Sequence, residues 1–139
     1  MQHPSIESTL GNTPLVRLQR LNQGLAPGVT VLCKMEGDNP AGSVKDRPAF
    51  YMVQGAQERG DIQPGDRLIE ATSGNTGISL AMMCAERGLK CVIVMPKDMS
   101  EERKKMMKFF GAELHEVEEG NFDVAIAYKE YLADKHGYM

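Results

Sequence analysis

A turn rich in hydroxyl and amide side chains lies near the middle of the chain. It reads Thr72-Ser-Gly-Asn-Thr-Gly77 and joins a predicted strand, residues 67–72, to a predicted helix, residues 78–87. The start of a helix presents unpaired N–H groups and a partial positive charge, so it attracts carboxylates and phosphates. Ligands of open α/β sheets bind at the carboxyl ends of strands, where this turn must lie. The turn is therefore a candidate anion site, and an ordinary capped turn is the competing interpretation.

One lysine stands in a setting that could make it a nucleophile. Lys45 follows the loop Asn39-Pro-Ala-Gly-Ser43 and lies at the start of a predicted helix, residues 44–59. The positive end of a helix disfavours an ammonium group, so this position favours a neutral amine that can form a Schiff base with a carbonyl. Most lysines are solvated surface charges, which is the alternative. The loop is not a P-loop, because it lacks the earlier glycine and the Gly-Lys-Ser/Thr ending.

The remaining reactive side chains form no such group. His3, His115 and His136 have no carboxylate or second histidine at ligand spacing, so no metal site is predicted. The three cysteines are odd in number and fit neither a CxxC motif nor a zinc spacing. This pattern predicts reduced thiols and a cytoplasmic location.

Composition narrows the class of protein further. The chain has 139 residues, enough for one compact domain, with 25% charged and 42% hydrophobic residues. Lys+Arg 16 against Asp+Glu 19 gives a net charge of -3 with the two signs interspersed. Without a basic patch a nucleic-acid partner is not expected, and no apolar stretch is long enough to span a membrane. The N-terminus has no charged region followed by an apolar one, so no secretory signal is visible.

These candidate sites must be positioned by strands that alternate with helices. Strands are predicted at residues 28–35, 67–72, 90–95 and 113–117, and helices at residues 44–59, 78–87 and 100–110 and after Asn121. Alternation at this spacing is typical of βαβ units, which build a parallel sheet. The nearly continuous apolar run at 90–95 indicates a sheet covered on both faces. The predicted fold is therefore three-layer α/β, a parallel sheet with helices on both faces.

Helical periodicity also predicts which side chains are buried. The third helix is expected to bury Met106, Met107 and Phe110, and the fourth helix places Val124, Tyr128, Tyr131 and Leu132 along one apolar stripe. The charged run Glu101-Glu-Arg-Lys-Lys105 is expected to be a solvated helix face. Residues 1–27 show little amphipathic order and are interpreted as an arm. We divide the chain into an N-terminal arm with the first strand, residues 1–35, and a small α/β domain, residues 36–139.

Three segments together resemble a known family. Gly11-Asn-Thr-Pro-Leu-Val16, Asn39-Pro-Ala-Gly-Ser-Val-Lys-Asp-Arg47 and Glu70-Ala-Thr-Ser-Gly-Asn-Thr-Gly77 occur in the order and spacing of the cysteine synthases, which are fold-type II pyridoxal-phosphate enzymes. Met95-Pro-Lys-Asp-Met-Ser100 and Gly111-Ala-Glu113 also fit. The loop at 39–43 is closer to the B-type (O-acetylserine sulfhydrylase B) than to the A-type. The resemblance covers nearly the whole chain, and its motifs are long and specific.

The resemblance implies a role for each candidate. Lys45 would bind pyridoxal 5'-phosphate through a Schiff base and then act as acid and base at the substrate α-carbon. Asn75 would hydrogen-bond the ring hydroxyl of the cofactor. The substrate α-carboxylate would be bound by Thr72, Ser73, Gly74, Asn75 and Thr76. The implied reaction is a β-replacement in cysteine biosynthesis, in which acetate leaves O-acetylserine and sulfide or a related thiol donor adds to give cysteine.

The same resemblance implies that these 139 residues are the smaller domain without its partner. Family members continue for about as long again and build a larger domain, which holds the glycine- and threonine-rich loop that cradles the cofactor phosphate. The early segment around residues 12–35 would pack on that domain. We therefore expect the isolated 139-residue chain to be inactive, and we expect it to form a homodimer through the uncovered arm.

Two other functions stay open on the sequence alone. One is a related pyridoxal-phosphate enzyme such as a cystathionine β-synthase or a serine dehydratase, although the Ser73-Gly-Asn-Thr76 pattern argues against the dehydratases. The other is a catalytically silent α/β domain or an interaction module derived from such an enzyme.

Overall fold

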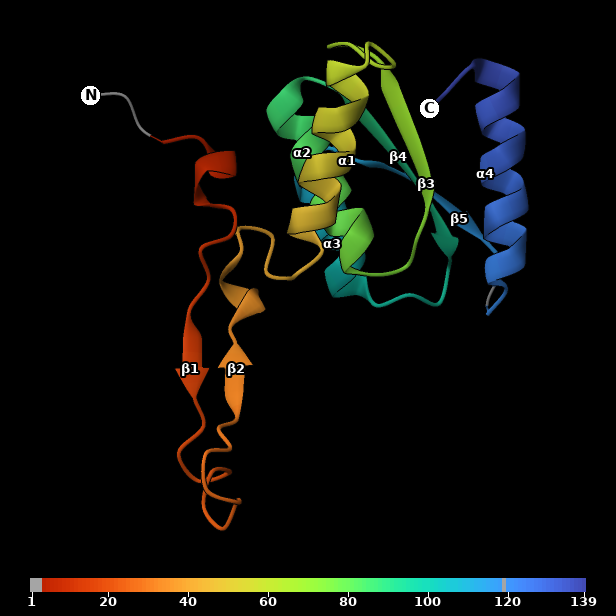
Figure 1. Ribbon diagram of the computed structural model, residues 1–139. Helices are drawn as coiled ribbons and strands as arrows, with labels where there is room; N and C mark the ends of the chain where they lie inside the picture. Colours follow the sequence, from red (N-terminus) through yellow and green to blue (C-terminus); the bar gives the residue numbers. More distant parts are fainter. Residues whose placement is uncertain (1–3, 119) are drawn as a thin grey trace.

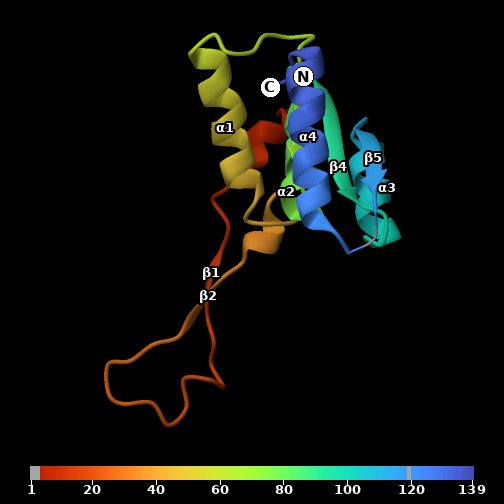
Figure 2. The same ribbon diagram turned by 90° about the vertical axis from the view of Figure 1, so that its right-hand side faces the viewer.

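The computed structural model describes residues 4–118 and 120–139, so His3 lies outside the described residues. It consists of an α/β domain and a narrow two-stranded ribbon that projects from one end of the domain (Figures 1 and 2). Within the described ranges, none of the helices is both long enough and apolar enough for a membrane span.

The centre of the domain is a parallel sheet of three strands. These are β3 (Arg67–Ala71), β4 (Lys90–Pro96) and β5 (Glu113–Val117), in the order β3-β4-β5. Parallel neighbours need a crossover, and the two crossovers are the helices α2 (Asn75–Arg87) and α3 (Glu101–Phe109). The middle strand β4 is buried from its second residue onward, as its continuous apolar sequence predicts.

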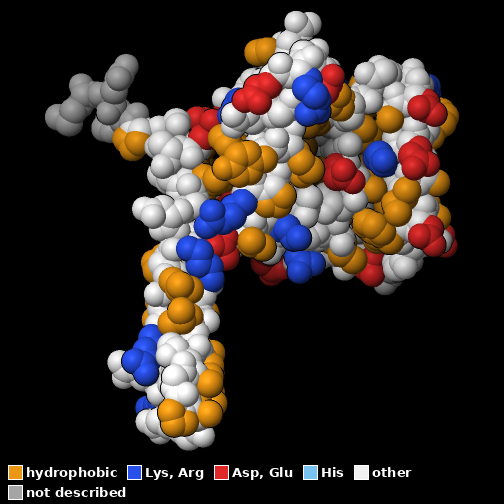
Figure 3. All heavy atoms as spheres, in the orientation of Figure 1, with side chains coloured by type: hydrophobic (Ala, Val, Ile, Leu, Met, Phe, Trp, Pro, Cys, Tyr) orange, Lys and Arg blue, Asp and Glu red, His pale blue; other side chains and the backbone are white. Residues whose placement is uncertain are grey.

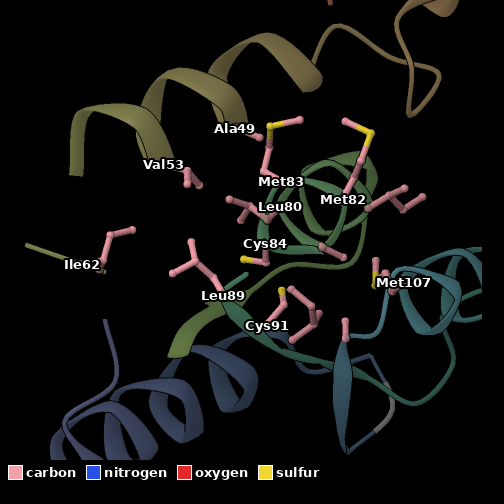
Figure 4. Packing of buried hydrophobic residues seen from close by; sticks show 14 of the residues in the cluster. Ala49, Val53, Ile62, Leu80, Met82, Met83, Cys84, Leu89, Cys91 and Met107 are labelled. Atoms are coloured by element: carbon pink, nitrogen blue, oxygen red, sulfur yellow. The ribbon is translucent and has the colours of Figure 1, made fainter. Parts of the chain in front are cut away.

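Helices cover both faces of this sheet. On one face lie α2 and α3, with α1 (Asp46–Glu58) packed on α2 as a further helix, and on the other face lies α4 (Phe122–His136), as Figure 1 shows. The larger apolar core surrounds α2 and includes Val53 from α1, Met83 from α2 and Met107 from α3 (Figure 4). A smaller core lies under α4. The predicted three-layer α/β fold is confirmed.

The first predicted strand is shorter than expected and belongs elsewhere. Of residues 28–35, only β2 (Leu32–Lys34) is a strand, and it pairs antiparallel with β1 (Leu15–Arg17) to form the ribbon. Asn22 stabilises the ribbon by hydrogen bonds to Val31 on both its N–H and its carbonyl. The alternation of apolar residues indicated an extended strand correctly. It carried no information about the pairing partner, so its assignment to the parallel sheet was wrong.

The residues that flank the ribbon are tied to the domain. The short 3-10 helix η1 (Ile6–Thr9) contacts α2, and Glu7 forms an ion pair with Arg87. On the other side of the ribbon, η2 (Glu36–Asp38) leads into the loop before α1. The division of the chain at residue 35 stays a prediction.

The N-terminus of α4 lies where the sequence predicts it, whereas α2 begins earlier than predicted. The cap of α4 is confirmed, because the Asn121 side chain accepts a hydrogen bond from the N–H of Val124 at 3.1 Å. In contrast, α2 begins at Asn75 and not at Ile78, because Gly74 is extended and the turn that follows it is already helical. Asn75 therefore lies in the first turn of α2, where N–H groups lack intrahelical partners.

Several predicted burials are wrong for one reason. In α4, Leu132 is buried, but Val124, Tyr128 and Tyr131 are exposed. This outermost helix needs only a narrow stripe to cover the sheet, and Ala125 completes that stripe. The periodicity defined the helix but not the width of its buried face.

In the third helix, too, periodicity predicted only part of the burial correctly. Met107 is fully buried and Phe110 packs on the core, whereas Met106 is exposed. The run at 101–105 is not wholly solvated, because Lys104 is only 6% exposed.

Candidate active site

Lys45 is the N-cap residue of α1, and its side chain is exposed. Its own N–H donates a hydrogen bond to the Oγ of the buried Ser43 at 3.1 Å. Gly42, with a φ of +88°, supplies the left-handed conformation that turns the loop into the helix. The amine is thus carried on a backbone that hydrogen bonds hold in place.

The loop before Lys45 is anchored by Asn39, which is 3% exposed. The Asn39 Oδ1 accepts a hydrogen bond from the N–H of Gly11 at 2.9 Å, and its Nδ2 donates to Glu36 Oε2 at 2.9 Å. The first two motifs of the sequence are therefore in direct contact, although 28 positions separate Gly11 from Asn39.

A carboxylate, a guanidinium and a hydroxyl extend this contact. Arg47 binds Glu36 through two parallel hydrogen bonds of 2.8 and 2.9 Å, and the Thr13 hydroxyl donates to Glu36 Oε1 at 2.7 Å. The Arg47 guanidinium, helped by Thr13, lowers the pKa of Glu36 to about 2. Glu36 is consequently ionised at neutral pH and holds the cluster together.

The turn after β3 leaves the start of α2 accessible. Thr72 is nearly buried, and its N–H donates to the Val94 carbonyl on the neighbouring strand at 3.0 Å. Ser73, Gly74 and Thr76 are partly exposed and Asn75 is exposed, so the start of α2 is open to solvent. Donor groups on an open helix start can bind a carboxylate.

Gly77 lets α2 begin close to its neighbours. A Cβ atom at this position would lie 2.8 Å from both Met107 Cε and Thr72 Cγ2. Any side chain here would therefore push against Thr72, which is one of the predicted substrate-binding residues.

The structure brings the two candidate segments together at the adjacent starts of α1 and α2. The Ser79 hydroxyl on α2 donates to Asp46 Oδ1 on α1 at 2.5 Å, next to Lys45 in the chain. Neither Asp46 nor Ser79 was among the sequence-based candidates. The sequence signal that could have pointed to Asp46 is its place directly after the candidate lysine. Acidic residues are common at helix starts for electrostatic reasons, so this signal is not specific.

Two cysteines of the described chain are buried in the core and away from the candidate site. Among residues 4–118 and 120–139, no three His, Cys, Asp or Glu side chains gather as a metal site. Cys84 and Cys91 face each other in the core (Figure 4), and the Cys84 thiol together with burial raises the pKa of Cys91. Buried thiols of raised pKa are unreactive.

The comparison with family models decides what this site belongs to. The model of the family described as "Pyridoxal-phosphate dependent enzyme" matches residues 6–139. The chain belongs to this family.

Among pyridoxal-phosphate dependent enzymes, the chain is similar to cysteine synthase B from two bacteria. The Pseudomonas aeruginosa protein is 58% identical over 117 residues, which are 82% of this chain and 38% of that protein. The Salmonella typhimurium protein is 53% identical over 131 residues, which are 91% of this chain and 43% of that protein. The resemblance to the cysteine synthases, closer to the B-type, is confirmed, and the chain spans less than half the length of these two relatives.

Solved structures of pyridoxal-phosphate dependent enzymes share the fold. A cysteine synthase from Entamoeba histolytica matches with a TM-score of 0.93 and 38% identity, over 100% of this chain and 43% of that one. An O-ureido-L-serine synthase matches with a TM-score of 0.88 and 38% identity, also over 43% of its length. The described residues therefore have the architecture of part of a fold-type II enzyme.

Proposed function

We propose that this chain supplies the cofactor lysine and the substrate-carboxylate turn of a cysteine synthase. The reaction would be the β-replacement in which O-acetylserine and a sulfide-type donor give cysteine and acetate. The observation that carries the proposal is the hydrogen bond between Asp46, next to Lys45, and Ser79, one helical turn after Asn75, in a chain similar to cysteine synthase B.

The residues present fit pyridoxal 5'-phosphate. An exposed primary amine on a hydrogen-bonded backbone can bind an aldehyde covalently, and Lys45 meets both conditions. Asn75, exposed at the helix start, offers an amide for the ring hydroxyl. When bound, the cofactor supplies an electron sink for charge that develops at the substrate α-carbon.

The chain's own residues would orient the substrate and move its proton. The turn formed by Thr72, Ser73, Gly74, Asn75 and Thr76 would bind the α-carboxylate through helix-start N–H groups and hydroxyls. Lys45, once its amine is released, would take the proton from the α-carbon as acetate departs and return it after the sulfur donor has added to the β-carbon.

Mapping of the reactive amine tests the proposal. Pyridoxal phosphate is added, the imine is reduced with borohydride, and the peptides are analysed by mass spectrometry. We expect the pyridoxyl group on Lys45, with a lower yield in Asn75→Ala because a contact to the cofactor ring is removed. An adduct predominantly on Lys34 or Lys97 would exclude Lys45 as the cofactor lysine.

Two other functions predict different results. A catalytically silent domain or an interaction module would show no preference for Lys45 over other exposed lysines. A related enzyme, such as a cystathionine β-synthase, would label Lys45 but would favour another substrate or donor in the whole protein. The proposed compartment is the cytoplasm, where the three free thiols would stay reduced.

A further inference from the structure

A carboxylate without exposed surface lies beside the candidate lysine. Asp46 is the first residue of α1 and is 0% exposed, although aspartates are almost never fully buried unless they are paired. Among the described residues, no cationic group lies within ion-pair distance of it. A buried charge needs other stabilising partners, since its desolvation is costly.

Both oxygens of Asp46 have a hydrogen-bond partner, and the two partners lie on different segments. Oδ2 accepts the N–H of Ala41 at 2.7 Å, within the loop that carries Lys45. Oδ1 accepts the hydroxyl of Ser79 at 2.5 Å, on α2. The position of Asp46 at a helix start also favours a negative charge there.

The Ser79 side chain continues this link to the anion turn. It is fully buried, and its Oγ lies 2.9 Å from the carbonyl oxygen of Asn75. The hydrogen bonds therefore run from Ala41 through Asp46 to Ser79, and Ser79 lies one helical turn after Asn75 on α2. Near this link the contacts between α1 and α2 are apolar, and apolar contacts are not directional. The hydrogen bond from Arg87 to Gln57 at 2.7 Å lies at the opposite, C-terminal ends of the two helices.

We propose that Asp46 is a positioning residue, which holds the Lys45 loop in register with the first turn of α2 through Ser79. The buried carboxylate supplies direction that the apolar contact lacks, so the amine and the carboxylate-binding turn keep a constant separation. A misplacement of about 1 Å at a reacting group can reduce a rate about 100-fold. The inference rests on the proposed function for its catalytic meaning, but the mechanical link can be tested alone.

Amide hydrogen exchange, measured by NMR on the 139-residue chain, tests the link. We expect Asp46→Ala to accelerate exchange about tenfold or more in the hydrogen-bonded amides of both segments, which are residues 41, 42 and 45 of the loop and residues 77–79 of α2, since a bond to a charged group is lost. Asp46→Asn should restore slow exchange, because its carbonyl can accept from Ala41 and its amide can donate to Ser79 Oγ. Asp61→Ala, at an exposed aspartate, is the matched control.

Ser79→Ala removes the same link from the other side. It should accelerate amide exchange at residues 77–79 and at residues 41, 42 and 45, and the double variant should exchange no faster than Asp46→Ala, because the two residues act through one bond. If Asp46→Ala does not fold, Ser79→Ala and Asp46→Asn still decide the question. Acceleration that is uniform across the chain, including β4, or that is confined to one segment would overturn the inference.

Labelling of Lys45 separates this inference from the proposed function. We expect the yield of the reduced pyridoxyl adduct on Lys45 to fall about tenfold in Asp46→Ala and to recover in Asp46→Asn, whose amide can make both hydrogen bonds. If the unmodified chain shows no adduct on Lys45, the proposed function fails while the exchange result stands. If the adduct yield is unchanged in Asp46→Ala, the positioning role fails while the function stands.

Discussion

Glu36 connects the first two motifs of the sequence. Its carboxylate binds Thr13 from the early motif and both Asn39 and Arg47, the first and last residues of the lysine motif. The bond to Arg47 is bidentate, the strongest geometry for such a pair. One side chain that no motif contains thus holds together the segments that carry the candidate lysine.

Because the pKa of Glu36 is low, we expect the free energy of unfolding to decrease when acid protonates this carboxylate. Because the folded-state pKa is about 2, against an ordinary value of 4.5, ionised Glu36 stabilises the fold fully above pH 4.5 and loses that effect as the pH falls towards 2. Denaturant unfolding of the natural chain and Glu36→Gln should therefore differ most at pH 5 to 7, with the difference shrinking from about pH 4.5 downward.

The control for this prediction is Asp61→Asn, whose ion pair with Arg59 is far more exposed. That variant should differ little from the natural chain at any pH, since exposed pairs contribute little. A stability difference for Glu36→Gln that is as large at pH 2 as at pH 6 would contradict the assigned pKa.

At the scale of elements, Lys104 joins α3 to two strands. The Nζ of this buried lysine donates to Glu116 Oε2 on β5 at 2.7 Å and to the carbonyl of Lys97, just after β4, at 2.6 Å. The Glu116 carboxylate beside it raises the pKa of Lys104 above its usual value. The side chain therefore fastens α3 to the carboxyl ends of the strands, the edge from which the substrate turn also starts.

Replacement of Lys104 tests whether its contacts with Glu116 and the Lys97 carbonyl stabilise the fold. Lys104→Met keeps the apolar stem but removes the amine, which leaves Glu116 and the Lys97 carbonyl without their donor. We expect the thermal midpoint to fall by roughly 5 °C. Lys105→Met, at the exposed neighbouring position, should leave the midpoint nearly unchanged. Equal losses in both variants would mean that helix propensity, and not the buried contact, is the cause.

At the scale of the whole molecule, the ribbon is an apolar surface without cover. Figure 3 shows hydrophobic side chains along its length on one face of the molecule. The exposed large apolar residues of the ribbon are Leu15, Val16, Leu21, Leu25, Val29, Val31, Leu32 and Met35. Monomeric soluble proteins rarely expose a contiguous apolar patch of more than a few hundred Å².

We expect the 139-residue chain to self-associate through this ribbon. Its apolar side chains and unpaired strand edges offer contacts that a second copy can satisfy. Replacing Leu15 and Leu32 by threonine and Leu21 by serine keeps the ribbon's strand propensity and should shift the chain towards monomer in sedimentation at roughly tens of micromolar. Phe109→Ser removes an exposed apolar residue outside the ribbon and should not cause this shift. A monomeric natural chain would contradict the prediction.

Cofactor affinity is also a property of the whole molecule. The family resemblance places the phosphate-binding loop in a part of the family sequence that these 139 residues do not match. Each charge-assisted hydrogen bond to a phosphate contributes about 1.5–3 kcal/mol, so we expect weak binding of pyridoxal phosphate and negligible turnover of O-acetylserine. Absorbance titration measures the affinity, and tight stoichiometric binding with rapid turnover would contradict this expectation.

The sequence alone determined the fold class, the order of the central elements and the family. Strands and helices from β3 to α4 follow from local periodicity and from capping residues such as Asn121, because these signals depend on neighbours in the chain. The motifs around Lys45 and Asn75 identified the family because long segments in register are specific. The roles of these residues stay predictions.

Only the tertiary structure decided what each segment packs against. It placed Leu32–Lys34 in a ribbon with Leu15–Arg17, left Tyr128 exposed and buried Lys104 against Glu116. It also joined Asp46 to Ser79, 33 positions along the chain. The physical reason is common to all four. Periodicity and propensity report the conformation of a segment, whereas burial, pairing and hydrogen bonds between distant residues depend on the surface that other segments present.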